Sequence, residues 1–383
     1  MPVDLLPALT DFAAHAFHTA SAAATAATQA ISATAAQAAG SGRPVLFPLA
    51  EVWWVYGLFT ILVLGVIALD LGVFHRKAHV VGFREAGIWS AIWVTLALTV
   101  NVLFWWWAEG HFIEAKGMSP AAAAAAADQA GLEFFAGYLM EKALAVDNIF
   151  VIAMVFTTFA IPPIYQHRVL FWGILGAIVF RAIFISIGAV LMQYHWIIVL
   201  AGIFLILTGI KMVLMGDGHK DPRDNPIVKL VRKIFPVTDQ LEGEKFFVRR
   251  AGVLMVTPLF LALCAVEVTD IIFAIDSVPA IYALTSEPLI VFMSNILAIL
   301  GLRAMYFLLA GTMDLFHLLK YSLAAILVFV GLKMAWLNKL FEDGKFPIGF
   351  SLLIIAALLS AGIALSLIFK KKAEEAPPSA PAA

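Results

Sequence analysis

The sequence predicts an all-α, polytopic membrane protein of about nine transmembrane helices, in which two three-helix units form an inverted repeat. Composition is the first observation: of 383 residues, 62% are hydrophobic and only 13% are charged, whereas soluble domains average about 45–50% and about 25%. The second is a series of apolar runs that each reach the roughly 20 residues needed to cross a bilayer. The third is that three short motifs occur twice in the same order.

Nine apolar runs separated by polar loops are the predicted spans. They begin near Val52, Gly87, Leu132, Val169, Trp196, Gly252, Pro288, Tyr321 and Pro347. Residues 1–50 form an Ala-rich tail, which we expect on the extracytoplasmic side. Residues 371–383 are polar and rich in proline, a composition that predicts a disordered tail.

Basic residues give the predicted orientation. Arg76 and Lys77 follow the first span, the long loop at 216–250 is rich in Lys and Arg, and three lysines follow the last span. These loops share one side of a nine-span chain, and the positive-inside rule assigns that side to the cytoplasm, with the N-terminus outside. The predicted segments are 1–50 (outer tail), 51–131 (two peripheral spans and an outer loop), 132–215 (first repeat), 216–250 (basic cytoplasmic loop), 251–338 (second, inverted repeat), 339–370 (last span) and 371–383 (cytoplasmic tail).

The repeat rests on matched motifs in the two units. Phe180–Phe184 reads FRAIF and Leu302–Tyr306 reads LRAMY, while Gly209–Met212 reads GIKM and Gly331–Met334 reads GLKM. Because each unit holds three spans, an odd number, the second unit starts on the opposite side of the membrane from the first. Many secondary transporters are built in this way and bind their substrate near the midplane between the repeats.

The strongest functional signal is a pair of acidic motifs inside predicted spans. Glu141–Asn148 reads EKALAVDN and Asp270–Ser277 reads DIIFAIDS, and an alignment of the two pairs acid with acid and amide with hydroxyl. A charged residue at bilayer depth costs about 2.5–3.5 kcal/mol on insertion scales. Two matched groups of acids therefore predict a cation site. The candidate ligands are Glu141, Asp147, Asn148, Glu267, Asp270, Asp276 and Ser277.

The chemistry of this ligand set narrows the cation. All the donors are oxygens, which suit Mg²⁺, Ca²⁺ and Mn²⁺ and do not suit soft ions such as Cu(I). Carboxylates that are removed from water take up protons when a cation leaves, which favours a metal/proton exchange hypothesis. Pro279 follows Asp276 by one helical turn, so we expect a break or kink there that lets Asp270 and Asp276 converge.

Basic residues inside the spans offer a second interpretation of the acids. The predicted structural counter-charges are Arg181, Arg303, Lys211 and Lys333. Some carboxylates would then pair with these bases inside the bundle rather than bind an ion. Lys211 and Lys333 lie near span ends, where a long side chain reaches the interface. Five acids against two deep arginines still leave an excess of negative charge.

Several function classes are excluded or disfavoured. The chain has no Walker pattern, so we expect no ATP-driven pump. The single cysteine, Cys264, excludes an internal disulfide and a multi-thiolate metal site. We predict no enzymatic activity, no resident cofactor and no nucleic-acid partner.

The acidic motifs resemble those of the TerC family of integral membrane proteins. The likeness is carried by EKALAVDNIF from Glu141 and VEVTDIIFAIDSVPA from Val266, and it covers roughly residues 50–370. It implies a bacterial inner-membrane protein, akin to the Alx-type manganese exporters of the lysine-exporter superfamily, with Mn²⁺ as the exported substrate. Tellurium resistance gave the family its name. By motif match, the seven candidate ligands above would be the cation-site residues.

Two alternatives stay open at this point. The first is a membrane scaffold or assembly factor in which the acids form a structural charge network. The second is an amino-acid exporter, in which Arg181 or Arg303 would contact the substrate carboxylate. The sequence leaves the oligomeric state open.

Overall fold

A computed structural model describes residues 45–69, 81–214, 221–238, 240–250, 252–310, 318–341 and 346–369. Nearly all of the predicted outer tail, the basic pair Arg76 and Lys77, and the C-terminal tail lie outside the described residues.

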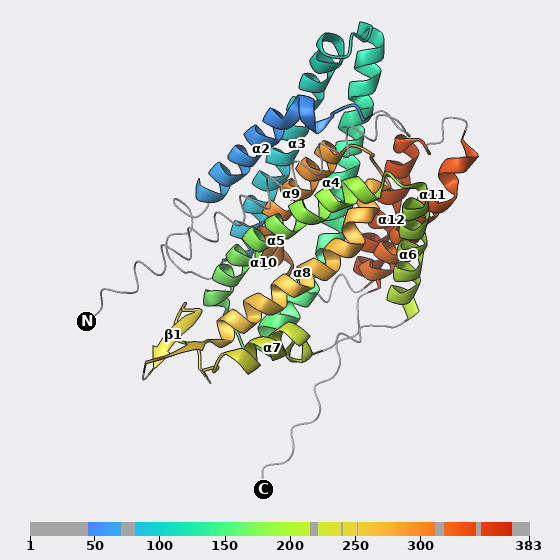
Figure 1. Cartoon of the computed structure of the whole chain (residues 1–383). Helices are drawn as coiled ribbons and strands as arrows, with labels where there is room; N and C mark the ends of the chain where they lie inside the picture. The colour runs from blue at the N-terminus through green and yellow to red at the C-terminus, as the bar shows by residue number, and fades with distance from the viewer. Residues whose placement is uncertain are drawn as a thin grey trace.

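Helices account for almost all of the described chain, and the prediction of an all-α polytopic protein is confirmed (Figure 1). The long helices are α2 (Leu49–Leu69), α3 (Phe83–Glu114), α4 (Pro120–Thr158), α5 (Pro163–Leu191), α6 (His195–Leu214), α8 (Pro258–Tyr282), α9 (Pro288–Leu300), α10 (Leu302–Ala310), α11 (Leu319–Ala335) and α12 (Ile348–Ile368). The shorter elements are η2 (Pro222–Asp224), α7 (Pro226–Ile234), β1 (Phe247–Arg250), β2 (Val253–Val256) and η4 (Leu337–Leu340).

Each predicted span corresponds to a helix or a pair of helices. By length and apolarity, α2, α3, α5, α6, α8 and α12 are able to cross a membrane, and α9 with α10 forms a seventh candidate that bends by 42°. The remaining two are α4, which has 39 residues and carries the first acidic motif, and α11, which has only 17 residues. Gly301 lies at the bend, where a Cβ atom would approach the Lys142 ammonium to 2.5 Å.

Three helices begin six or more residues from their expected positions, and one of them is α5, which starts at Pro163 rather than near Val169. The third span was expected near Leu132, but α4 starts twelve residues earlier at Pro120, with Ser119 as its N-cap, because alanine is the strongest helix former. The sixth span was expected from Gly252, but β1 and β2 form an antiparallel hairpin here and α8 starts only at Pro258. Gly252 has φ +85°, a conformation that glycine adopts without strain and that permits the turn.

Helix packing follows a two-fold pattern that agrees with the inverted repeat. Helix α5 packs on α8, and α9, its counterpart, packs on α4. Helices α6 and α11 pack closely, because a Cβ atom on Gly202 would meet the Gly331 carbonyl oxygen at 2.8 Å and one on Gly209 would meet that of Ala324 at 2.7 Å. The contact positions rise along α6 as they fall along α11, so the two helices are antiparallel. The motif alignment pairs Gly202 with Ala324 and Gly209 with Gly331. The repeat therefore relates the Gly202–Gly331 contact to the Gly209–Ala324 contact.

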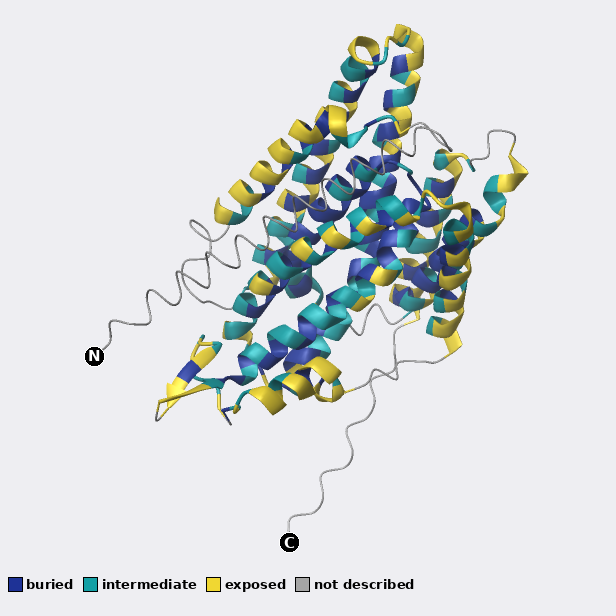
Figure 2. Ribbon diagram, in the orientation of Figure 1, coloured by how far each residue is buried: buried dark blue, intermediate teal, exposed yellow. Residues whose placement is uncertain are grey.

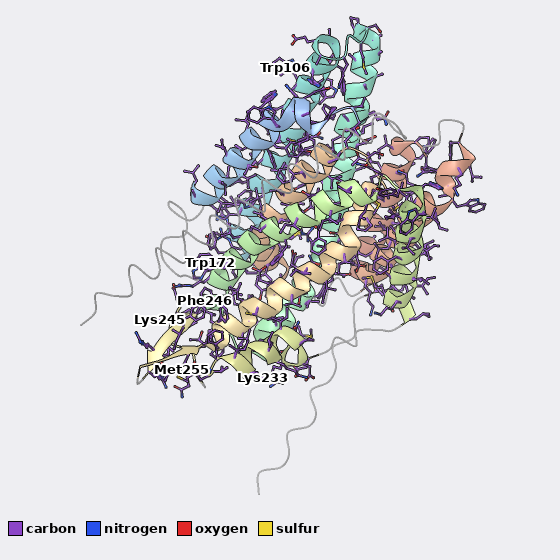
Figure 3. The ribbon with its side chains drawn as sticks, in the orientation of Figure 1. Trp106, Trp172, Lys233, Lys245, Phe246 and Met255 are labelled. Atoms are coloured by element: carbon purple, nitrogen blue, oxygen red, sulfur yellow. The ribbon has the colours of Figure 1, made fainter. Side chains whose placement is uncertain are left out.

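Burial is greatest at the centre of the bundle, where α8 and α9 pack against α4 (Figure 2). Eleven of the 13 residues of α9 are buried, whereas α2 and α6 expose many apolar side chains (Figure 2). The ends of the bundle differ in chemistry: Lys233 and Lys245 lie at the end occupied by α7 and the hairpin, and Trp106 lies at the opposite end (Figure 3). The acidic motifs of α4 and α8 therefore sit in the buried centre.

Candidate ion-binding site

Arg181 of α5 is the centre of the buried polar cluster. Only 1% of the residue is exposed. Its Nη1 atom contacts Glu141 Oε1 closely and donates to Ser277 Oγ at 3.3 Å, and its Nη2 atom lies 3.1 Å from Asp270 Oδ1. One guanidinium thus connects an acid from each repeat, because α4 and α5 both pack on α8.

Asn295 of α9 completes this cluster and was not anticipated from the sequence. Its amide nitrogen donates to Glu141 Oε2 at 3.1 Å, and its Oδ1 accepts from Arg181 Nη1 at 3.3 Å. The side chain is fully buried. A signal was present, because a lone asparagine inside an apolar run must find polar partners when it is buried.

The charges of the cluster do not balance. Glu141 and Asp270 carry two negative charges against the single positive charge of Arg181. Buried charges are costly unless they are paired. The cluster therefore has capacity for one further positive charge, either a proton or a metal ion.

A small cavity adjoins the cluster on the other side of Asp270. Its volume is about 20 Å³, enough for one water molecule. Asn148, Thr269 and Asp270 provide the polar part of its lining. Asn148 is 4% exposed, and its side-chain oxygen has no hydrogen-bond partner. Such an atom is unusual in a buried position and marks a place where a ligand or water would be stabilised.

Glu267 lies one helical turn before Asp270 and faces α5. Its carboxylate rests against Gly176 so closely that no Cβ atom would fit there. One of its carboxylate oxygens is buried without a hydrogen-bond partner, and Asp270 is close enough for its charge to act on Glu267. Gly176 was not anticipated either, because its role depends on which face of α5 meets α8.

The remaining two predicted acids have other surroundings. Asp276 is half-buried and faces α6, where Thr208 hydrogen-bonds its carboxyl and Lys211 lies near. Asp147 is half-buried beside Asn148, but adjacent residues point about 100° apart on a helix. Within the described ranges, no group of three or more His, Cys, Asp and Glu residues is placed to hold a metal. Any ion site here must use amide and hydroxyl oxygens as well.

The expected break in the sixth span does not occur. Helix α8 is continuous across Asp276 and Ser277, with Pro279 inside its last turn. A proline so near the end of a helix removes only one hydrogen bond, which the helix tolerates. The two motifs approach each other through packing of α4 on α8 and through the reach of Arg181, without unwinding.

The other predicted counter-charges differ in position. Arg303 is buried and lines a separate cavity with Trp93, Phe171 and Leu300. Lys333 is buried near the end of α11, and Lys211 is exposed near the end of α6.

A second buried acidic pair near the start of α9 was not anticipated. Thr285 donates to Glu133 Oε2 at 2.5 Å, and Gln129 donates to Glu133 Oε1 at 2.8 Å. Glu287 accepts the backbone N–H groups of Leu46 and Phe47 at 2.9 and 3.1 Å. This carboxylate fastens the segment before α2 to the bundle.

An all-α membrane protein with an inverted repeat and a buried charge cluster at its centre belongs to the class of transporter-like membrane proteins. Residues 126–374 match the "Integral membrane protein TerC family", and the chain belongs to that family. The resemblance of the acidic motifs is thereby confirmed.

Relatives match most of the chain. A Myxococcus xanthus protein, "Uncharacterized membrane protein STKORF319", is 47% identical over 84% of this chain and 95% of its own length. Two proteins named "Putative membrane-bound redox modulator Alx" are also similar: that of Photorhabdus laumondii is 44% identical over 84% of this chain and 97% of its own length, and that of Escherichia coli K12 is 45% identical over 80% and 91%. No solved structure matches the chain.

Proposed function

We propose that this protein is a secondary transporter that exports divalent metal cations, above all Mn²⁺, through the site between α4, α5 and α8. The observation that carries the proposal is the position of Asp270. Asp270 contacts Arg181 and also lines a cavity together with Asn148, whose buried side-chain oxygen has no partner. A cation in the cavity would satisfy both groups.

The oxygen chemistry of the lining supports a hard or borderline metal. Asp270, Asn148 and Thr269 each offer an oxygen, and the other cavity residues are apolar. Mn²⁺ accepts carboxylate, carbonyl and water ligands together. The resemblance of the acidic motifs to those of manganese exporters favours this metal over Mg²⁺ and Ca²⁺.

Protons are the proposed counter-ion. Glu267 has an unpartnered carboxylate oxygen next to Asp270, so it is the acid best placed to take up a proton when the metal leaves. A proton on Glu267 would replace one of the two positive charges that leave with the metal, which lowers the cost of returning the empty carrier.

The bacterial inner membrane, with the N-terminus outside, is the proposed location. The lysines at the end that holds α7 and the hairpin support a cytoplasmic position for that end (Figure 3). The proposed partners are the bilayer, the metal and protons. We assign the protein no enzymatic or nucleic-acid role.

A scaffold is the second candidate, and the completeness of the Arg181 cluster favours it. Four polar groups surround the guanidinium, as in a structural charge network. The names of the Alx relatives describe a redox modulator, and a scaffold that supports membrane redox proteins would agree with them.

Metal flux in proteoliposomes separates the two candidates. Purified protein is reconstituted around a metal-quenched dye, and Mn²⁺, Mg²⁺, Ca²⁺ and Zn²⁺ are added in turn at several pH gradients. A transporter gives protein-dependent Mn²⁺ flux that changes with the pH gradient, and its Asp270→Asn variant, compared at an equal amount of folded protein, is expected to lose flux. An absence of flux for every ion, with reduced abundance of Asp270→Asn, would contradict transport and support the scaffold.

A further inference from the structure

The inverted repeat relates each group around Arg181 to a counterpart in the other half. Alignment of the acidic motifs exchanges Glu141 with Asp270 and Asn148 with Ser277. The groups that bind the guanidinium include Glu141, Asp270 and Ser277. The counterparts of Glu141, Asp270 and Ser277 are, in that order, Asp270, Glu141 and Asn148. We call the groups around Arg181 the Arg181 half-site, and the related groups around Asn148 the second half-site.

The counterpart of Asn295 is a glycine. Gly173 stands eight residues before Arg181, and Asn295 stands eight residues before Arg303, so the arginine motifs align these two positions. In the Arg181 half-site, the Asn295 amide bridges the guanidinium and Glu141. In the second half-site, the corresponding position has no side chain.

The cavity occupies this second half-site. Asn148, Gly173 and Asp270 all line it. The missing side chain of Gly173 thus explains why a space of about 20 Å³ exists here. Ser277 accepts from Arg181, so the repeat would pair its counterpart Asn148 with Arg303. Arg303 instead lines the separate cavity beside Trp93, and the Asn148 oxygen has no partner. One half-site is filled by an arginine and an asparagine of the protein itself. The other has the same kind of acceptors and room for a small guest.

We propose that Arg181 is a built-in competitor of the transported cation: a divalent metal ion enters the Asn148–Gly173 half-site and takes the Asp270 carboxylate from Arg181. The inference rests on the proposed transport function and adds to it a mechanism for the same site. In the metal-free protein Arg181 neutralises Asp270. In the metal-bound protein Arg181 remains with Glu141 and Asn295.

The surroundings of the two acids identify Asp270 as the group that changes partner. Asp270 lines the cavity, and its two oxygens lie 3.1 and 3.5 Å from nitrogens of Arg181. Charge-assisted N–H···O bonds are usually about 2.7–2.9 Å, so the Asp270 contacts are long. The Asn295 amide also holds Glu141 in place. Arg181 is therefore anchored on the Glu141 side and loosely bound on the Asp270 side.

Competition of this kind favours divalent ions. A monovalent cation would gain no charge advantage over the guanidinium that it replaces at Asp270. A divalent ion attracts the carboxylate about twice as strongly at equal distance. The half-site supplies Asp270, the Asn148 oxygen and the Thr269 hydroxyl, and bound water would complete the coordination.

Substitutions at Arg181 and at Gly173 have opposite expected effects on Mn²⁺ affinity and test the inference. Binding to the protein in lipid nanodiscs is measured from the loss of the paramagnetic resonance signal of free Mn²⁺. Arg181→Gln removes the competitor, so Mn²⁺ should bind at least tenfold more tightly, while flux falls because release is slowed. Arg181→Lys restores a competing charge and should return the affinity toward the wild-type value.

The substitution at Gly173 fills the second half-site. Gly173→Asn supplies the amide that the repeat lacks, at the cost of a close contact between its Cβ atom and Val266 Cγ1 at 3.3 Å. At an equal amount of folded protein, Mn²⁺ affinity should fall at least tenfold. The matched control is Gly57→Asn, because nothing lies within 4 Å of a Cβ atom at Gly57.

The outcomes separate the inference from the proposed function. If the wild-type protein binds and transports Mn²⁺ but Arg181→Gln and Gly173→Asn leave its affinity unchanged, the competition is wrong and transport stands. If Arg181→Gln does not fold, an unchanged affinity of Gly173→Asn is enough to overturn the half-site. If the wild-type protein neither binds nor transports any divalent ion, the proposed function fails and the inference fails with it.

Discussion

Arg181 of α5 and Asp270 of α8 lie 3.1 Å apart in the buried centre of the bundle, and the same guanidinium contacts Glu141 of α4. One positive charge therefore connects α4 and α5 of the first repeat with α8 of the second. Stability and ion binding therefore depend on the same few side chains.

Glu141→Ala should destabilise the protein strongly, because it leaves Arg181 without its closest partner. Removal of one member of a buried ion pair typically costs about 3–5 kcal/mol. Thermal unfolding in detergent, followed by tryptophan fluorescence, measures the loss. The double variant Glu141→Gln/Arg181→Gln should lose less than the sum of its single variants; simple additivity would show that the two residues do not interact.

Gly202→Ala should weaken the packing of α6 on α11. The new Cβ atom would meet the backbone oxygen of Gly331 at 2.8 Å, and a backbone atom cannot move aside as a side chain does. Overpacking of this kind costs about 1–3 kcal/mol. Gly57→Ala, which has open space around the new atom, is the control, and equal unfolding temperatures for the two variants would contradict the close approach.

Gly176→Ala should change transport more than stability. The added methyl group would displace the flexible end of Glu267, which can rotate away at little cost in folding free energy. If Glu267 carries the proton, the variant should lose most of the dependence of flux on the pH gradient. Gly65→Ala, with nothing near its Cβ position, should keep that dependence, and an unaltered pH response in Gly176→Ala would argue against the role of Glu267.

Glu287→Ala should release the segment before α2. Two backbone N–H groups, those of Leu46 and Phe47, would lose their acceptor, and an unsatisfied buried group costs about 1–3 kcal/mol. Hydrogen exchange at the Leu46 and Phe47 amides should become faster while exchange in the central helices stays slow. The exposed pair Lys229 and Asp224 offers a control, because Asp224→Ala should leave this segment protected. Unchanged exchange in Glu287→Ala would contradict the fastening role.

The sequence predicted the class of fold, because hydropathy is a property of the chain alone. The pairing of Arg181 with Glu141 and Asp270 agrees with the second interpretation of the acids, in which basic residues inside the spans act as counter-charges. The sequence did not predict Asn295 or Gly173, since their importance depends on how α5 and α9 turn against the acidic helices. The expected break at Pro279 was wrong because the proline lies at the end of α8, where one lost hydrogen bond matters little.

The most direct test of the central claim is Mn²⁺ flux into proteoliposomes with Asp270→Asn. Asp270 belongs to both the Arg181 cluster and the cavity, and Asn preserves its size while removing its charge. At equal amounts of folded protein, the account predicts that wild type and the exposed control Asp224→Asn transport Mn²⁺ and that Asp270→Asn transports at least tenfold less. Wild-type flux that persists in Asp270→Asn would contradict an ion path through this carboxylate.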